Sequence, residues 1–222
     1  MSAAVRLSAL VVVLLLAACV TPRPVTAPPI AGTERTPLQL LAAVQSDADG
    51  IEQAKDPAQR AQLLAEATLS AQQCLAQSAA SAICRYTHAQ VLGLTAREHP
   101  VQAVALLKQM LAELMKAEGL DPALDHAGPA RLTAVVLLRA PPWPLGPGDV
   151  DGALVAAQRA VQRDSTYPPN LITLAQVEAK SENPGQARAT YAKAQSAVQA
   201  WTASADRAQW QRSIEQGLRE LQ

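Results

Sequence analysis

The chain contains no phenylalanine, and it has only three tryptophans and three tyrosines among 222 residues. A core without large aromatic side chains must be built from Ala, Leu and Val, which suits close packing of one helix against another. Stretches with the alternating pattern of β-strands are also missing. These absences favour an all-α protein, and helical periodicity runs through most of the sequence.

The sequence also lacks a block of basic residues. Lys and Arg number 19 in total, as do Asp and Glu, so the net charge of the chain is zero. A near-neutral chain offers no electrostatic footprint for nucleic acid. The same balance gives no strong attraction to an anionic lipid surface.

Catalytic and metal-binding motifs are missing as well. The three histidines stand far apart, outside any H-E-x-x-H or H-x3-5-H frame: His88, His99 and His126. The sequence contains no G-x-S-x-G elbow, Walker loop or dinucleotide fingerprint. Asp125 beside His126 could act as an acid–base pair, but a helix-capping aspartate is the simpler interpretation. We therefore expect no enzymatic activity, no cofactor and no metal site.

The first 18 residues have the features of a targeting segment. Arg6 precedes the apolar run Leu7–Leu16, which is too short to span a bilayer. The sequence Leu-Ala-Ala that follows, ending at Cys19, resembles a bacterial lipobox. That resemblance implies cleavage before Cys19, which would carry the lipids, with sorting to the outer membrane and exposure to the periplasm. The alternative is an ordinary signal peptide in which Cys19 is incidental.

Residues 19–36 form a proline-rich stretch between this cysteine and the helical part of the chain. Such a stretch cannot form a helix and favours extended, polyproline-like structure. At about 3.1 Å per residue it would reach roughly 50 Å from the membrane. We expect it to act as a tether for a folded domain at residues 37–222.

Cys74 and Cys84 are left as an even pair once Cys19 is acylated. An oxidising periplasm favours a disulfide, and residues 78–81 between the two cysteines have the composition of a turn. The pair predicts a bridge that clamps two consecutive helices. The alternative is two buried thiols that never meet.

Helix start signals and apolar periodicity predict helices throughout the folded part. Thr36-Pro37 and Asp56-Pro57 each combine an N-cap residue with proline at the first helical position. Further helices are expected from Ile83, from Pro100 and from Gly128. The Pro- and Gly-rich stretch 141–148 predicts a loop. A one-sided apolar stripe, Trp210, Ile214, Leu218 and Leu221, predicts a terminal capping helix.

The stretch Asp149–Gln199 repeats itself with a period of 34 residues. Small residues recur at the same helical positions: Ala153, Ala157 and Ala160 are matched by Ala187, Tyr191 and Ala194. This period, with small residues where two helices touch, resembles the tetratricopeptide (TPR) repeat. The resemblance implies an all-α, TPR-like solenoid of helical hairpins, and stacking modules of this kind usually bind proteins.

Repeat geometry also predicts where a partner would bind. In TPR packing, the residue after the small contact residue faces the concave groove, and here those residues are Val135 and Gln176. Arg131, Arg139 and Lys180 fall near the same face and would make the groove mildly basic. A solvated helix face is the alternative interpretation of these five positions.

The middle of the chain carries a second resemblance. Asp121-Pro122, Gly128-Pro129-x-Arg131 and the Pro-rich loop 141–144 resemble the pattern "DP…GP-x-R-x-L-G" of TPR-like lipoproteins that include the T components of TRAP transporters. Thr133-Ala134 replaces the Leu-Gly of that pattern. The resemblance implies a protein–protein interaction adaptor that partners a periplasmic solute-binding protein. Alternatives are a carrier of an apolar small ligand in a helical cavity or pore, and a scaffold for envelope assembly.

Overall fold

Helices make up most of the chain that the structure describes. The computed structural model describes residues 34–202 and 206–222, of which Arg35–Gln222 form one compact unit. The expected signal peptide, the lipobox with Cys19 and nearly all of the tether lie outside the described residues. Within the described ranges, no helix is both long enough and apolar enough to cross a bilayer.

The described elements follow one another along the chain with short connections. They are α1 (Pro37–Gln53), α2 (Pro57–Gln77), α3 (Ala82–Glu98), the short 3-10 helix η1 (Pro100–Gln102), α4 (Ala103–Leu120), α5 (Leu124–Arg139), α6 (Val150–Arg163), α7 (Pro168–Lys180), α8 (Pro184–Ala200) and α9 (Arg207–Glu220). Apart from the end of α5, the longest connection is the expected loop between α5 and α6.

The predicted helix starts are confirmed by their capping contacts. The Thr36 side chain accepts a hydrogen bond from the Gln39 backbone N–H, and the Gln39 side chain accepts one from the Thr36 N–H. This capping box satisfies two donors that the first turn leaves unpaired. Asp56 caps α2 by accepting from the Ala58 N–H at 3.0 Å. Proline follows both caps, as the sequence indicates.

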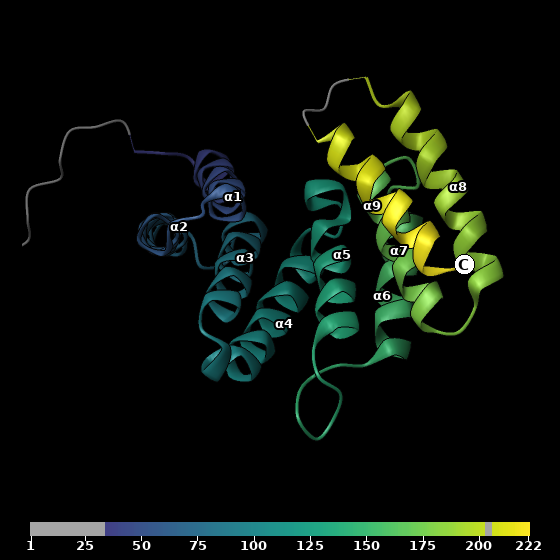
Figure 1. Ribbon diagram of the computed structural model, residues 1–222. Coiled ribbons are helices and arrows are strands. Elements are labelled where there is room, and N and C mark those ends of the chain that lie inside the picture. Colours follow the sequence, from purple (N-terminus) through teal and green to yellow (C-terminus); the bar gives the residue numbers. More distant parts are fainter. Residues whose placement is uncertain (1–33, 203–205) are drawn as a thin grey trace, which may run out of the picture. The chain divides into compact units, whose positions relative to one another are not determined.

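Consecutive helices pack in pairs, as Figure 1 shows: α1 with α2, α3 with α4, α5 with α6, and α7 with α8. The first helices of successive pairs also contact each other, and α9 packs against α7 and α8. The part of the chain that the structure describes is therefore an all-α stack of helical hairpins whose last pair is covered by α9. This confirms the predicted all-helical hairpin architecture.

Alanines form the seam between the paired helices. Ala153 and Ala157 of α6 are fully buried with Ala134 of α5, and Ala187 and Ala194 of α8 are fully buried against α7. Small side chains let helix backbones approach closely, so each helix buries a stripe that it could not bury alone. The seam inferred from the 34-residue period is therefore present.

The Cys74–Cys84 bridge joins α2 to α3. Cys74 lies near the end of α2 and Cys84 in the first turn of α3, with 5.1 Å between their Cα atoms. Both cysteines are fully buried and pack against Leu40 of α1. The predicted clamp between consecutive helices is thus formed, and it sits in the core of the N-terminal hairpins.

The beginning of α5 differs from a regular helix. Asp125, His126 and Ala127 have φ angles of 49°, 55° and 62°, so three residues with side chains form a left-handed turn. This conformation is unfavourable for residues other than glycine, and surrounding contacts must hold it. The right-handed helix starts after the turn at Gly128-Pro129, where the sequence predicts it. The turn itself was not predicted.

Candidate functional site

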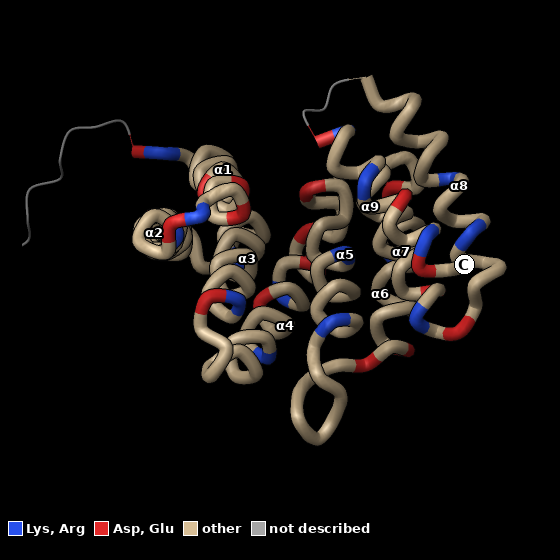
Figure 2. Tube along the Cα trace, in the orientation of Figure 1, with Lys and Arg blue, Asp and Glu red and all other residues tan. Residues whose placement is uncertain are grey.

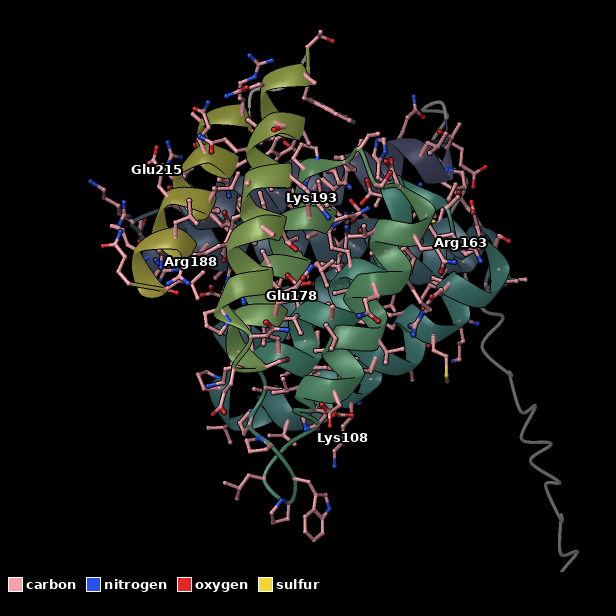
Figure 3. The ribbon with its side chains drawn as sticks, turned by 90° about the vertical axis from the view of Figure 1, so that its right-hand side faces the viewer. Lys108, Arg163, Glu178, Arg188, Lys193 and Glu215 are labelled. Atoms are coloured by element: carbon pink, nitrogen blue, oxygen red, sulfur yellow. A yellow bond between two sulfur atoms is a disulfide. The ribbon has the colours of Figure 1, made fainter. Side chains whose placement is uncertain are left out.

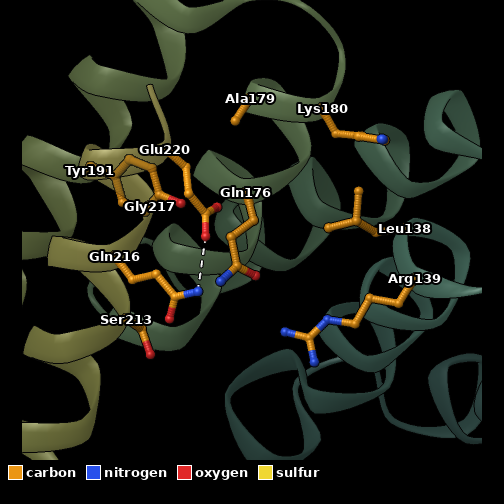
Figure 4. Close-up of a pocket in the computed structure, with 10 residues that line it drawn as sticks. All are labelled: Leu138, Arg139, Gln176, Ala179, Lys180, Tyr191, Ser213, Gln216, Gly217 and Glu220. Carbon is orange, nitrogen blue, oxygen red and sulfur yellow. Dashed lines mark hydrogen bonds between the residues drawn. The ribbon is translucent and has the colours of Figure 1, made fainter. Parts of the chain in front are cut away.

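The last turns of α5 and α7 face α9 across a cavity of about 360 Å³, which we call the C-terminal groove (Figure 4). Its walls come from four helices, since α8 contributes one side chain. The lining residues are Leu138, Arg139, Gln176, Ala179, Lys180, Tyr191, Ser213, Gln216, Gly217 and Glu220. The groove is the described cavity that contains most of the predicted partner-binding residues.

Three of those predicted residues, Arg139, Gln176 and Lys180, line this groove. Arg139 and Lys180 are exposed and lie in the last turns of α5 and α7. Neither cation has a hydrogen-bond or ion-pair partner among the described residues. In Figure 4 the Arg139 guanidinium extends from α5 toward the middle of the groove. The groove therefore holds two cationic donors whose bonding capacity is unused.

The opposite wall is polar and carries one acid. The Gln216 side-chain amide donates to the Glu220 carboxylate at 2.9 Å (Figure 4). Burial, and then the charge of Glu220, raises the pKa of Tyr191 to about 12, so its hydroxyl stays protonated. A side chain at Gly217 would overlap that hydroxyl, and only glycine lets α9 approach Tyr191 here.

Val135 does not line the groove, contrary to the prediction. It is partly buried and lies one turn before Arg139, whereas the groove is formed by the last turns of α5 and α7. The periodicity of α5 correctly placed Val135 on the same side as Arg139. It gave no information on how far along the helix the cavity extends.

Arg131 is also absent from the groove, and the structure gives it a different environment. Its side chain is only 8% exposed and donates to the Asp125 carbonyl at 3.2 Å and to the His126 carbonyl at 3.1 Å. These are carbonyls of the left-handed turn. The guanidinium also donates to the Asp125 carboxylate at 3.1 Å. The prediction that Arg131 faces a partner is therefore corrected, because its donors are used to hold the turn.

Two further buried side chains complete this network around the left-handed turn. The Tyr86 hydroxyl of α3 donates to the Asp125 carboxylate at 2.6 Å. Asn170 of α7 accepts from Arg131 at 3.0 Å, and its amide donates to the His126 carbonyl at 2.9 Å. The network joins α3, α5 and α7, and Asp125 pairs with Tyr86 and Arg131 rather than acting as the expected helix cap.

Aromatic side chains gather beside the turn. His126 stacks on Tyr167 with 4.3 Å between ring centroids, and its Nδ1 lies 2.7 Å from the Asp164 carboxylate. Trp201 and Trp210 contact Tyr167 edge-on, and Arg131 lies 5.0 Å from the Tyr167 ring centre. Half of the six Trp and Tyr residues of the chain thus support the connection of α5 with the α6–α7 loop.

A second cavity, of about 720 Å³, lies along α6, α7 and α8. Its apolar lining includes Val161, Leu171, Leu174, Ala197 and Trp201. Lys193 of α8 is on its rim, and Figure 3 shows this lysine on the face turned toward the reader. The cavity has the size and lining of a site for a small apolar ligand.

Charged side chains elsewhere are interspersed over the helices, as Figure 2 shows, rather than gathered into one block. Within residues 34–202 and 206–222, no group of three His, Cys, Asp or Glu side chains lies close enough to hold a metal ion. Comparison with protein-family models and with curated proteins gives no match to this sequence. The function is therefore argued from the groove and the helical stack alone.

Proposed function

We propose that the protein is a membrane-anchored periplasmic adaptor of TPR type that binds an acidic segment of an envelope protein in its C-terminal groove. The observation that carries the proposal is the pair of unpartnered cations, Arg139 and Lys180, on the wall of one cavity. Hairpin order supports the TPR assignment, since α5, α7 and α9 are first helices and meet on one side.

The groove chemistry selects for an acidic ligand. A carboxylate placed between Arg139 and Lys180 would accept charge-assisted hydrogen bonds, which are stronger than those between neutral groups. Gln176 and the protonated Tyr191 hydroxyl add neutral donors beside them. Glu220 repels a carboxylate from the opposite wall, so the ligand has one preferred orientation.

The size of the groove limits the ligand to a short segment. A volume of about 360 Å³ lies near the lower end of small-molecule sites, and it accepts a few side chains rather than a protein surface. The resemblance to T components of TRAP transporters points to a periplasmic solute-binding protein as the source of that segment. An envelope-assembly partner would use the same contacts.

Capture from periplasmic extract tests the proposal. The double variant Arg139→Glu/Lys180→Glu should lose partner capture while its thermal midpoint stays within a few degrees, because both side chains are exposed and unpaired. Arg163→Glu is the matched control, since Arg163 is an exposed cation in the last turn of α6 and does not line the groove. Unchanged capture by the double variant would reject the groove.

The apolar cavity along α6, α7 and α8 favours a second candidate, a carrier of a small apolar ligand. Its lining by Leu171, Leu174 and Trp201 is the supporting observation. A carrier purified from membranes should hold an apolar molecule detectable by native mass spectrometry. Ala197→Trp, which adds bulk to the lining, should reduce the bound fraction, and its absence in the parent protein would reject this candidate.

A further inference from the structure

The loop between α5 and α6 exposes two large apolar side chains at its tip. Trp143 is 84% exposed and Leu145 is 73% exposed. Figure 1 shows this loop extending past the helix ends, and Figure 2 shows no charged residue on it. Residues 140–148 contain no Asp, Glu, Lys or Arg. We call Trp143 and Leu145 the apolar tip.

The loop holds this tip in a defined conformation. The Pro142 carbonyl accepts from the Leu145 N–H at 3.0 Å and the Gly146 N–H at 3.1 Å, and the Pro141 carbonyl accepts from the Gly148 N–H at 2.8 Å. A side chain at Gly148 would overlap the backbone of Ala140. Since the backbone is already ordered, little conformational entropy is lost when the tip binds something.

A second apolar residue is exposed at the same end of the stack. Val101, in η1 between α3 and α4, is fully exposed. The α3–α4 and α5–α6 connections both join the two helices of a hairpin, so they lie at one end, as Figure 1 shows. The loop also lies at the same end as Lys108 in Figure 3. Two separate apolar projections therefore point in one general direction.

The form of these projections indicates what receives them. A convex tip cannot enclose a small ligand, so whatever receives it must surround it. A lipid–water interface surrounds two separate projections without needing a matched pocket for each. Tryptophan favours that interface, because its ring is apolar and its N–H remains available to water and headgroups.

Charge near the tip is balanced. Arg139 precedes the loop and Asp149 follows it, so the loop has no net attraction for anionic headgroups. Insertion would depend on apolar contact, and it should be insensitive to ionic strength.

We propose that Trp143 and Leu145 insert into the lipid–water interface of the membrane that carries the protein. This rests on the proposed anchoring through Cys19. A tether spanning residues 19–36 reaches roughly 50 Å, which keeps the domain close to the bilayer and raises the local concentration of the tip at its surface. Insertion would then orient the hairpin stack with its α5–α6 end toward the lipid.

Fluorescence quenching tests the insertion on the full-length lipidated protein. The protein is reconstituted in phosphatidylcholine vesicles containing lipids brominated on their acyl chains, which quench tryptophan only where it enters the bilayer. We expect quenching of the wild type, its loss in Trp143→Ala and its reduction in Leu145→Ser. The quenching should persist at about 0.5 M NaCl, where surface attraction is screened.

Leu69→Ser is the matched control, because Leu69 of α2 is 64% exposed and lies on a helix rather than at the tip. It should leave the quenching unchanged. A protein that floats with the vesicles without being quenched overturns the insertion and leaves the anchor intact. A protein that neither floats nor is quenched overturns both. Unchanged quenching in Trp143→Ala, combined with weaker partner capture, would mean that the tip docks a protein, and it also overturns the proposal.

Discussion

The Tyr86 hydroxyl donates a 2.6 Å hydrogen bond to the Asp125 carboxylate, which also receives Arg131 at 3.1 Å. This contact joins α3 to the left-handed turn that precedes α5. The hydroxyl fits because residue 128 is glycine, since a side chain there would overlap Tyr86. The position of α5, and with it that of Arg139 in the groove, therefore depends on a buried polar contact made far from the groove.

Tyr86→Phe should destabilise the fold by about 1–2 kcal/mol, because a buried hydrogen bond to a charged group is lost while the ring still fills its site. Burial raises the pKa of Tyr86, so the wild-type hydroxyl is a donor at all ordinary pH values. Tyr191→Phe is the matched control, since Tyr191 is equally buried and its hydroxyl has no hydrogen-bond partner among the described residues. Equal urea midpoints for the two variants would contradict this account.

Arg131→Glu should destabilise the protein by roughly 3–5 kcal/mol, the usual effect of breaking a buried ion pair, because it faces the Asp125 carboxylate and the turn carbonyls with a second negative charge. Arg139→Glu, eight residues along the same helix, should change the free energy of unfolding by less than about 0.5 kcal/mol. Chemical denaturation of both variants measures the difference. Similar, small losses would place Arg131 back on a solvated face.

Ala187→Leu should overpack the alanine seam and destabilise by about 1–3 kcal/mol, because Ala187 is fully buried between helices. Ala192→Leu, at an exposed position of the same helix, should be close to neutral. Circular dichroism melts of the pair check the seam. An Ala187→Leu variant as stable as Ala192→Leu would show that the helices have space between them.

Acid should weaken the contact between α3 and α4. Burial opposes ionisation of Glu113, but hydrogen bonds from Lys116 and Arg85 outweigh it and hold its pKa below the ordinary value of 4.5. A depressed pKa in the folded state means that the stabilisation is complete above the unfolded pKa and is lost as pH falls through the folded pKa. Urea midpoints measured from about pH 7 down to about pH 3 should fall less steeply for Glu113→Gln than for the wild type. Parallel curves would contradict the assignment.

Local signals in the sequence predicted much of the fold. Thr36 and Asp56 marked helix starts through short-range capping, and the proline-rich stretch 141–148 could only be a loop. The alanine seam was visible because the repeat places small residues at a fixed period. The Cys74–Cys84 contact followed from a short separation across a turn. Each of these depends on neighbours within one or two helices.

The parts that were missed depend on distant contacts. Arg131 shares a helix face with Arg139, so periodicity alone assigned both to the groove. Its burial results from the left-handed turn before α5 and from Asn170 of α7, which lies 39 residues away. The aromatic cluster joins His126 to Tyr167 and Trp201 across three connections, and no periodic pattern signals such a meeting. Gly128-Pro129 was the available clue, because it fixes where the regular helix can begin.

The central claim is that Arg139 and Lys180 bind an acidic segment, and a calorimetric titration with defined peptides tests it most directly. The account predicts that an Asp/Glu-rich hexapeptide binds the wild type, that added salt weakens the binding, and that a Lys-rich hexapeptide does not bind. Arg139→Glu/Lys180→Glu should abolish the binding while Arg163→Glu retains it. Equal binding of both peptides to the wild type, or unchanged binding of the acidic peptide to the double variant, would contradict the account.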